Sequence, residues 1–313
     1  MNRGRSELPA TADITPGPIN RREVAFNLND PRPPSSSLLH QLVDSLLAAF
    51  FPSDCSLCGE ELDGLNGGGI CRKCWEGFRP TTHPLCTRCG VFFPSERALE
   101  SSDALCAECR RQEYAFDLAR SFDLYSGKLR AAILQLKFHH RERLGRKLGE
   151  LLCSLWSSIG GPDLEDPPIL VPVPLHHHRR RQRGYNQAEL LAQGLAKGLA
   201  RRTEGARTLR VETRCLRRLR PTLPQTGLDP RARSDNVRGA FDIASPERVR
   251  KKTVLLLDDV MTTGATVSAC AEVLKRAGAR RVVVLALARA TPQFPDIASA
   301  LLTIPAANGD NTM

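Results

Sequence analysis

The sequence predicts an α/β fold, a mostly parallel sheet flanked by helices, preceded by a small cysteine-rich module. Short apolar runs alternate with helical patterns from about residue 116 onward, which is typical of a sheet covered on both faces. Eight of the 11 cysteines form four C-x-x-C pairs ahead of that point. A chain of 313 residues is long enough for one sizeable domain and a smaller module. We expect a disordered tail, a helix with the cysteine module, the α/β domain and a second tail at 1–37, 38–114, 115–306 and 307–313.

The predicted N-terminal tail is rich in Pro, Ser, Asn and Arg and has no sustained periodicity. Leu38–Phe50 has apolar residues at helical spacing, which predicts a helix packed on the next module. The alternative, a helix on a membrane surface, is disfavoured because the stretch lacks Lys and Arg. No apolar run reaches the roughly 18–20 residues that span a bilayer, and no secretory signal follows Arg3 and Arg5. We expect a cytoplasmic protein without membrane insertion.

The paired cysteines have the spacing of zinc ligands. Two thiolates separated by two residues on a tight turn can face one tetrahedral ion, and Gly59 and Gly90 follow the second cysteine of their pairs. Intervals of 12 and 16 residues suit a hairpin between pairs, which favours sequential over crossed pairing. Four thiolates leave no open position on the ion, so both sites are expected to be structural. The predicted ligands are Cys55, Cys58, Cys71, Cys74, Cys86, Cys89, Cys106 and Cys109.

The predicted elements of the α/β domain follow from the apolar pattern. The expected buried strands are Ile169–Val173, Thr253–Leu257 and Arg281–Ala288. The expected helices are one that ends over Ala131–Phe138, then Gln187–Leu199 and Thr266–Ala277. The segment Arg218–Asn236 holds three prolines and many arginines, which predicts a long loop and a candidate lid over a site.

The segment Val254–Thr266 has the composition of a ribose-phosphate site. Asp258 and Asp259 follow a buried strand, and ligands of parallel sheets bind at the carboxyl ends of strands. Gly264 permits close approach of the backbone, and the following helix offers free N–H groups to an anion. Carboxylates repel a phosphate but accept hydrogen bonds from sugar hydroxyls, so a ribose phosphate satisfies both halves of the segment. A Walker-B strand is excluded because the chain lacks the partner phosphate-binding motif.

The same segment, VLLLDDVMTTGAT, resembles the phosphoribosyl-pyrophosphate motif of type I phosphoribosyltransferases. The resemblance extends to the ComF family (competence protein F and gluconate-associated relatives), which joins a cysteine ribbon to this fold. Further shared elements are Leu136-Lys137-Phe138, Val171-Pro172-Val173-Pro174, Arg183-Gly184-Tyr185-Asn186-Gln187, and Gln225 with Arg233, Asn236 and Ala240-Phe241.

The resemblance implies a role for each part of the site. Asp258 and Asp259 would bind the ribose hydroxyls, and Arg233 in the lid would act with them in catalysis. The 5-phosphate loop would be Thr262, Thr263, Gly264, Ala265 and Thr266. The pyrophosphate loop would be Pro174, Leu175 and His176, with Arg179 and Arg183 reaching the diphosphate. Mg²⁺ would bridge the diphosphate and ribose oxygens. The alternative for the stretch HHHRRRQR is a solvated basic turn.

Two functions are compatible with these features. The first is binding of phosphoribosyl pyrophosphate or a ribose phosphate with Mg²⁺, with transfer of the phosphoribosyl group to a nitrogen acceptor. The second is handling of single-stranded DNA together with DNA-uptake proteins, which the basic segment favours, since residues 176–238 hold 16 Lys/Arg against five Asp/Glu. The aromatic content of 5% disfavours the second function, because base stacking needs aromatic side chains.

Overall fold

The computed structural model describes residues 54–62, 68–93, 104–161, 167–202, 209–221 and 236–290. Both predicted tails, the predicted helix at Leu38–Phe50, Gln225 and Arg233 lie outside these ranges. Among the described helices, none is both long enough and apolar enough to cross a bilayer.

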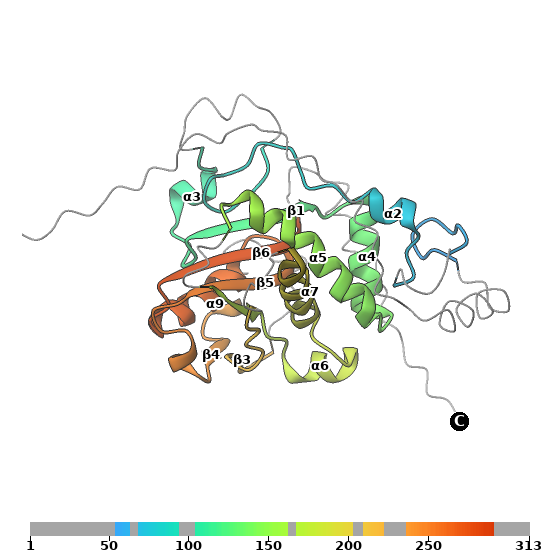
Figure 1. Ribbon diagram of the computed structural model, residues 1–313. Helices are drawn as coiled ribbons and strands as arrows, with labels where there is room; N and C mark the ends of the chain where they lie inside the picture. The colour runs from blue at the N-terminus through green and yellow to red at the C-terminus, as the bar shows by residue number, and fades with distance from the viewer. Residues whose placement is uncertain are drawn as a thin grey trace, which may run out of the picture.

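A four-stranded parallel sheet forms the centre of the described part, in the order β1-β6-β5-β2 (Figure 1). Its strands are β1 Leu118–Leu124, β2 Ile169–Pro172, β5 Thr253–Met261 and β6 Arg281–Arg289. A separate antiparallel ribbon pairs β3 Leu216–Arg218 with β4 Phe241–Ile243. The prediction of a mostly parallel α/β sheet is therefore confirmed.

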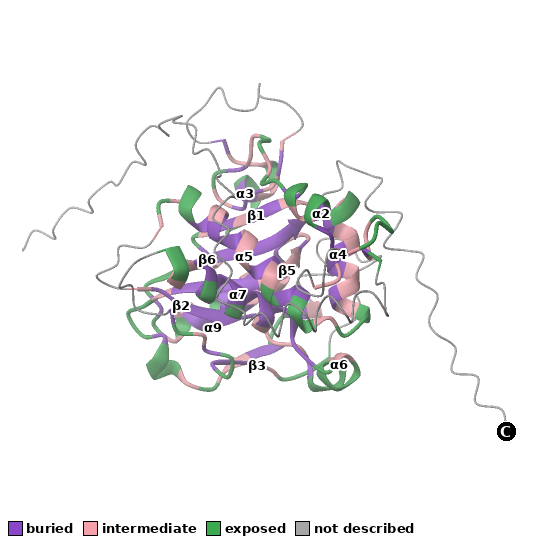
Figure 2. Cartoon of the chain, turned by 45° about the vertical axis from the view of Figure 1, so that its right-hand side comes forward, coloured by how far each residue is buried: buried purple, intermediate pink, exposed green. Residues whose placement is uncertain are grey.

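Helices cover both faces of this sheet. The helices are α2 Arg72–Glu76, α3 Ala107–Arg111, α4 Gly127–Phe138, α5 Glu142–Ser158, α6 His177–Arg183, α7 Gln187–Arg202 and α9 Ala265–Arg276, with a 3-10 turn at Pro246–Arg248. Leu255 and Leu257 of β5 face α4, α5 and α7, whereas Val254 and Leu256 face α9 and the β3–β4 ribbon. The strands lie buried between the two layers, and α6 lies exposed at the rim (Figure 2).

The cysteine modules pack on the two opposite faces. The first module, residues 54–78, belongs to the core that contains α4, α5 and α7. The second module, residues 84–111, belongs to the core that contains α9. Figure 1 shows α2 of the first module near α4 and α3 of the second module near β1, at opposite ends of the molecule.

Several element boundaries differ from the prediction. β5 runs through both acids to Met261, because β6 pairs with it along its whole length. The helix after the threonine loop begins at Ala265 rather than Thr266. Within the stretch HHHRRRQR, His177–Arg183 form the helix α6, and Gly184 ends it with a φ of 78°. Arg218 belongs to β3 instead of a loop, since it pairs with Phe241.

Candidate functional site

The two predicted acids lie where β5 extends beyond its neighbour. β2 pairs with β5 only as far as Pro172 opposite Leu257, while β6 continues alongside as far as Arg289. Asp258 and Asp259 are the first two residues past that point. An opening beside the carboxyl end of β2 therefore exposes both side chains to the same pocket. This is the edge of a parallel sheet at which ligands bind.

The two carboxylates have different surroundings because successive side chains of a strand point to opposite faces. Asp259 accepts from the ammonium of Lys137 on α4 at 3.2 Å, with side chains 14% and 18% exposed. Asp258 lies toward α9 and the β3–β4 ribbon, near Cys270 and Arg218. Burial raises the pKa of Asp258 to about 7, and the neighbouring charge of Asp259 adds to the rise. Both effects favour the neutral form of the Asp258 side chain.

A pocket of about 200 Å³ collects much of the predicted site. It is lined by Asp258, Asp259, Pro174, Leu175, Arg179, Arg183 and Thr266 from the prediction, and by Lys137, Val173, Asn186, Gln187, Ala188, Arg218 and Val260 in addition. His176 lines a neighbouring hollow together with Arg179 and Arg218. The pocket thus joins the carboxylates to a group of cations, which suits a ligand that carries both hydroxyls and phosphates.

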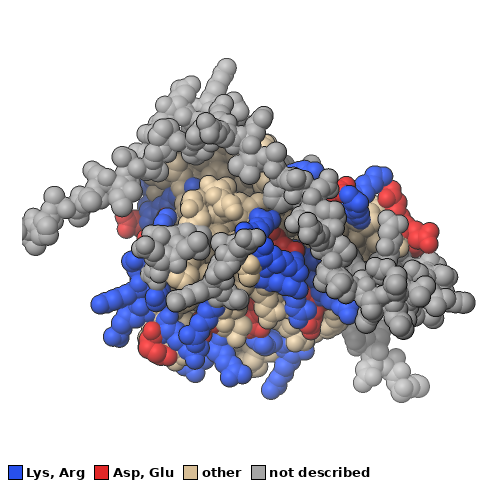
Figure 3. Space-filling view, in the orientation of Figure 1, with Lys and Arg blue, Asp and Glu red and all other residues tan. Residues whose placement is uncertain are grey.

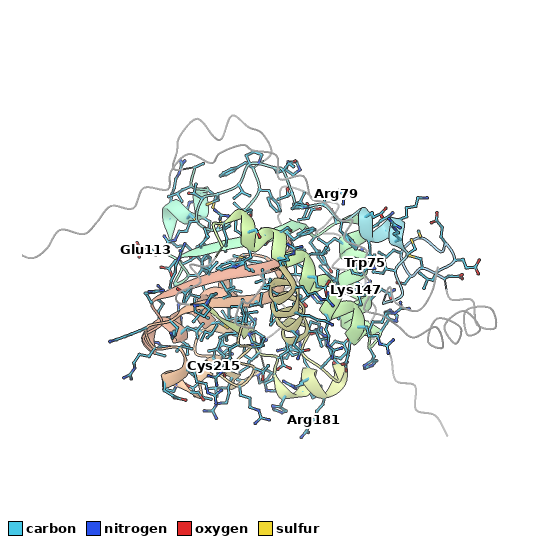
Figure 4. The ribbon with its side chains drawn as sticks, viewed as in Figure 1. Trp75, Arg79, Glu113, Lys147, Arg181 and Cys215 are labelled. Carbon is cyan, nitrogen blue, oxygen red and sulfur yellow. The ribbon has the colours of Figure 1, made fainter. Side chains whose placement is uncertain are left out.

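The arginines of α6 separate into two sets. Arg179 and Arg183 line the pocket, and burial lowers the pKa of Arg183. Arg180 instead makes a bidentate pair with Glu189, at 2.7 and 3.1 Å. The labelled Arg181 lies at the lower edge of the molecule and points away from the sheet (Figure 4). Helical geometry explains this division, because residues four apart share a face.

The sequence pattern missed three pocket residues as ligand contacts. Gln187 is 1% exposed; its Oε1 accepts from Arg183 at 3.1 Å, and its Nε2 has no partner among the described residues. Lys137 and Arg218 contribute charge from α4 and β3. Lys137 and Gln187 belong to the sequence elements shared with the family, and that membership could have identified them as pocket residues. No shared element includes Arg218, which was predicted to lie in a loop.

The side chains of Tyr185 and Asn186 make hydrogen bonds that hold the elements around the pocket together. The amide nitrogen of Asn186 donates to Val173 O at 3.0 Å, and Asn186 Oδ1 accepts from the N–H of Ala188 at 3.1 Å. Tyr185 donates to the carbonyl of Leu136, next to Lys137, at 2.5 Å. The Arg-Gly-Tyr-Asn-Gln element therefore fixes α4, α7 and the end of β2 around the pocket.

The predicted 5-phosphate loop, Thr262–Thr266, called the phosphate loop below, runs from the end of β5 into the first two residues of α9. Gly264 has a φ of 88°, a left-handed conformation that side chains rarely adopt, and it precedes the first turn of α9. Gly264 itself has no side chain to cap that turn, and Thr263 Oγ1 accepts from the N–H of Ala265 at 3.4 Å. The other first N–H groups of a helix lack partners within the helix. Thr266 lines the pocket, while Thr262, Thr263 and Ala265 belong to the same short loop beside it. This arrangement offers N–H donors and hydroxyls to an anion.

The eight paired cysteines form two compact thiol clusters. Within each cluster the four sulfur atoms lie within 4.8 Å of one another, and the pairing is sequential: Cys55, Cys58, Cys71, Cys74 and Cys86, Cys89, Cys106, Cys109. Two sulfur pairs, Cys58–Cys71 and Cys89–Cys106, are 3.6 Å apart, close to the roughly 3.8 Å edge of a tetrahedron with zinc–sulfur bonds of about 2.3 Å. The residues therefore fit two structural zinc sites.

The two clusters are built alike. In each, an amide N–H donates to the first cysteine's sulfur: Cys71 to Cys55 at 3.3 Å and Cys106 to Cys86 at 3.4 Å. Each third cysteine is also the residue that precedes a short helix, α2 or α3. N–H donors lower the cost of negative charge on sulfur, as a metal-bound thiolate requires.

Comparison with known proteins agrees with both parts of the molecule. The chain matches the double zinc ribbon domain over residues 46–110 and the phosphoribosyl transferase domain over residues 191–305. It is 31% identical to competence protein F of Haemophilus influenzae over 243 residues, which cover 77% of this chain and 99% of the relative. The chain belongs to the ComF family.

Further relatives of this ComF protein carry names that refer to DNA utilization or to competence. It is 32% identical to DNA utilization protein YhgH of Escherichia coli K12 over 76% of this chain and 97% of the relative. It is 24% identical to competence protein ComFC of Bacillus subtilis over 67% of this chain and 79% of the relative. The fold is the phosphoribosyltransferase fold that the domain match and the parallel sheet indicate.

Among solved structures, the ComF protein matches the allosteric regulatory enzyme of purine biosynthesis with a TM-score of 0.29 and 19% identity, over 46% of this chain and 26% of that chain. It matches the glutamine phosphoribosylpyrophosphate amidotransferase of B. subtilis, complexed with ADP and GMP, with the same TM-score and identity, over 45% and 25%.

Proposed function

We propose that this ComF protein binds phosphoribosyl pyrophosphate, or a related ribose phosphate, with Mg²⁺, and transfers the phosphoribosyl group to a nitrogen acceptor. The observation that carries the proposal is the pocket at the end of β5. It places Asp258 and Asp259 opposite Arg179, Arg183 and the start of α9. Cysteines arranged in two clusters that suit zinc are typical of a reducing compartment, so we place this activity in the cytoplasm.

The division of charge in the pocket matches the parts of such a ligand. The carboxylates accept hydrogen bonds from the 2- and 3-hydroxyls of the ribose, and the phosphate loop holds the 5-phosphate. The forked guanidiniums of Arg179 and Arg183 bind the diphosphate oxygens in pairs. The unpartnered Nε2 of Gln187 provides one further donor for a ligand oxygen.

Mg²⁺ prefers oxygen ligands, so the carboxylates of Asp258 and Asp259 together with the ligand's own oxygens suit it, and it would neutralise part of the diphosphate charge. In the transfer, the bond between C1 of the ribose and the diphosphate breaks as the acceptor nitrogen forms its bond to C1. Pyrophosphate leaves with the bonding electron pair, and the acceptor nitrogen then loses its proton. The chain's cations stabilise the leaving group, and no side chain acts as a nucleophile.

The direct test is calorimetric titration of phosphoribosyl pyrophosphate into the zinc-loaded protein, with and without Mg²⁺. We expect Asp259→Asn and Arg179→Ala each to weaken binding about 10- to 100-fold, since each removes a charged hydrogen bond. Arg181→Ala is the matched control for Arg179→Ala, because it removes the same charge from the same helix on the side away from the pocket. Absence of Mg²⁺-dependent binding by the unmodified protein would refute the proposal.

Turnover is tested separately by measuring pyrophosphate release against a panel of nitrogen bases and amines. We expect release to depend on one class of acceptor and to be lost in Asp258→Asn and Asp259→Asn. If no acceptor in a broad panel supports release while binding persists, the transfer step is wrong and the protein acts as a ligand-binding protein.

A second candidate function, handling of single-stranded DNA, is favoured by the distribution of charge and by the names of the relatives. Figure 3 shows Lys and Arg side chains gathered over the lower part of one face, where α6 and the β3–β4 ribbon lie. Relatives of this chain are named for competence and DNA utilization. We propose that the same basic surface guides single-stranded DNA and brings the protein to DNA-uptake partners.

Salt-titrated binding of an oligonucleotide tests this second function. Neutralising several phosphates makes affinity fall steeply with salt, with a slope of roughly −0.7 per contacted phosphate for single strands. We expect Arg181→Ala to reduce that slope while leaving phosphoribosyl pyrophosphate affinity unchanged. A flat salt response would refute DNA handling by this surface.

A further inference from the structure

The phosphate loop is bonded to a segment that follows the second cysteine module. Tyr114 donates from its hydroxyl to the carbonyl of Thr263 at 2.9 Å, and the two residues are 149 positions apart. The ring of Tyr114 stacks on Phe116 with centroids 4.8 Å apart and planes 15° from parallel. The next residue, Ala115, donates its N–H to Ser268 of α9 at 3.1 Å. Tyr114 therefore holds the loop near its midpoint.

Arg289 makes a second connection between the module and the site. It is 3% exposed at the end of β6, where Met261 is its neighbour on β5. Its guanidinium donates to the carbonyl of Cys89 at 3.0 Å and approaches the sulfur of Cys89 at 3.9 Å. A buried cation requires a compensating anion, and a zinc ion with four thiolates carries a net charge of about −2. The occupied cluster thus supplies the counter-charge for Arg289.

The second module is also fixed rigidly to the sheet. The N–H of Ala119 in β1 donates to the carbonyl of Arg88 at 2.9 Å, and Arg88 in turn donates to the carbonyl of Tyr114 at 2.8 Å. Arg120 donates to the carbonyls of Cys86 and Thr87 at 3.4 and 3.0 Å. A Cβ at Gly90 would lie 2.4 Å from the carbonyl oxygen of Ala119, so only glycine permits this approach.

These contacts form one continuous path from the thiols to the loop. Cys89, Tyr114 and Met261 belong to the same buried cluster as Val267 in the first turn of α9. We propose that the second cysteine module, with zinc bound, is a positioning element for the phosphate loop, and that Tyr114 is the residue through which it acts. The inference rests on the proposed binding of a ribose phosphate for its functional consequence, but its structural part can be measured without a ligand.

The test compares Tyr114→Phe with the unmodified zinc-loaded protein. The change removes the hydroxyl and keeps the stacked ring, so we expect both zinc ions to remain. We expect amide exchange to accelerate in peptides covering residues 262–268, because the loop loses its bond at Thr263. Affinity for ribose 5-phosphate should fall about three- to tenfold, the effect of one lost hydrogen bond.

Trp75→Phe in the first module is the matched control, since it also trims an aromatic side chain beside a thiol cluster. We expect it to leave the exchange of residues 262–268 and the affinity for ribose 5-phosphate unchanged. Equal effects of Tyr114→Phe and Trp75→Phe on the loop would overturn the proposal, as would a Tyr114→Phe variant with normal loop exchange.

A double variant tests whether zinc acts through Tyr114. Cys106→Ser should release the zinc of the second cluster and loosen the loop, and adding Tyr114→Phe should cause no further acceleration of its exchange. Additive effects would overturn the proposed path. If the unmodified protein fails to bind ribose 5-phosphate while Tyr114→Phe still accelerates loop exchange, the positioning role stands and the proposed function fails.

Discussion

On one face of the sheet the first cysteine module packs against α4 and α5. On the other face the second module is hydrogen-bonded to β1 and β6, and Tyr114, which follows it, is hydrogen-bonded to the phosphate loop. The first module contacts its face through Arg141, which donates to the carbonyl of Gly69, and through Lys147, which lies over the ring of Trp75 (Figure 4). None of the contacts described for it reaches Asp258–Thr266. The two modules are built alike, but among the described residues only the second is connected to the candidate site.

The acids follow the same division. Asp259 faces the layer of the first module and is paired with Lys137, whereas Asp258 faces the layer of the second module and has a raised pKa. The comparison teaches that the repeat in the sequence does not imply a repeated role. Substitutions within the second module should affect the loop, and substitutions within the first module should affect only stability.

The largest effect is expected from loss of a thiol ligand in the second module. Cys89 is 1% exposed and Cys58 is exposed, so Cys89→Ser should destabilise the protein far more than Cys58→Ser. We expect Cys89→Ser to lower the free energy of unfolding on the order of 5 kcal/mol, since structural zinc contributes folding free energy directly. Urea unfolding and zinc content by mass spectrometry measure both variants.

The same pair of variants tests the functional side of the comparison. Cys58→Ser should lose one zinc ion yet retain affinity for ribose 5-phosphate. If Cys58→Ser weakens binding as much as Cys89→Ser does, the two modules serve the site equally and the comparison breaks down.

The next largest effect is expected from Arg289→Met. The substitution keeps an apolar stem of similar length but leaves the negative cluster without its buried cation. Breaking one side of a buried charge pair costs about 3–5 kcal/mol, so we expect a loss of that size in urea unfolding. When a chelator removes the zinc, the negative charge of the cluster falls. The difference in free energy of unfolding between Arg289→Met and the unmodified protein should then shrink. A difference that is independent of zinc would show that packing alone explains the loss.

A smaller change in the free energy of unfolding is expected when either acid is replaced by asparagine, with opposite signs for Asp258 and Asp259. The pKa of Asp258 is about 7 in the folded chain and near 3.9 in an unfolded chain, so unfolding releases a proton between those values. The stability associated with this group is fully present at low pH and is lost as pH rises toward 7. Asp258→Asn should therefore stabilise the ligand-free protein at pH 8 by about 1–2 kcal/mol, after allowance for partial exposure, and have little effect at pH 4.

Asp259→Asn is the counterpart on the other face. It leaves the mostly buried ammonium of Lys137 without its carboxylate, so we expect a loss of about 1–2 kcal/mol at pH 8. Urea unfolding of both variants at pH 4 and pH 8 provides the measurement. Destabilisation by Asp258→Asn at pH 8 would contradict the environment described for this acid.

The sequence predicted the parallel sheet, its strands β2, β5 and β6, and both thiol clusters, because each depends on local periodicity or on fixed spacing. Strand β1 and the β3–β4 ribbon were not among the predicted elements. The sequence also did not predict that β5 continues through the acids, since that depends on pairing with β6. It placed Arg218 in a loop because a three-residue strand has no pattern of its own. The domain boundary after residue 114 and the lid role of Arg233 remain predictions.

The bond from Tyr114 to Thr263 was beyond the reach of sequence reasoning for a related reason. The two residues are 149 positions apart, nearly half of the chain, and neither lies in a motif that refers to the other. Arg289 likewise lies one residue beyond the predicted strand Arg281–Ala288, and its partner, Cys89, was predicted only as a zinc ligand. Contacts between motifs depend on how the modules pack on the sheet, which a single sequence does not show.

The smallest effect is expected from Lys147→Met in the first module. The ammonium of Lys147 lies 5.3 Å from the centre of the Trp75 ring, and burial lowers the pKa of Lys147. The attraction to the ring therefore opposes a cost of desolvation, and the net loss on substitution should be about 0–1 kcal/mol. Exchange at residues 262–268 and affinity for ribose 5-phosphate should match the unmodified protein, measured alongside Arg289→Met. Faster amide exchange at residues 262–268, or weaker affinity for ribose 5-phosphate, in Lys147→Met would mean that the first module also affects the site, through α5 and α4.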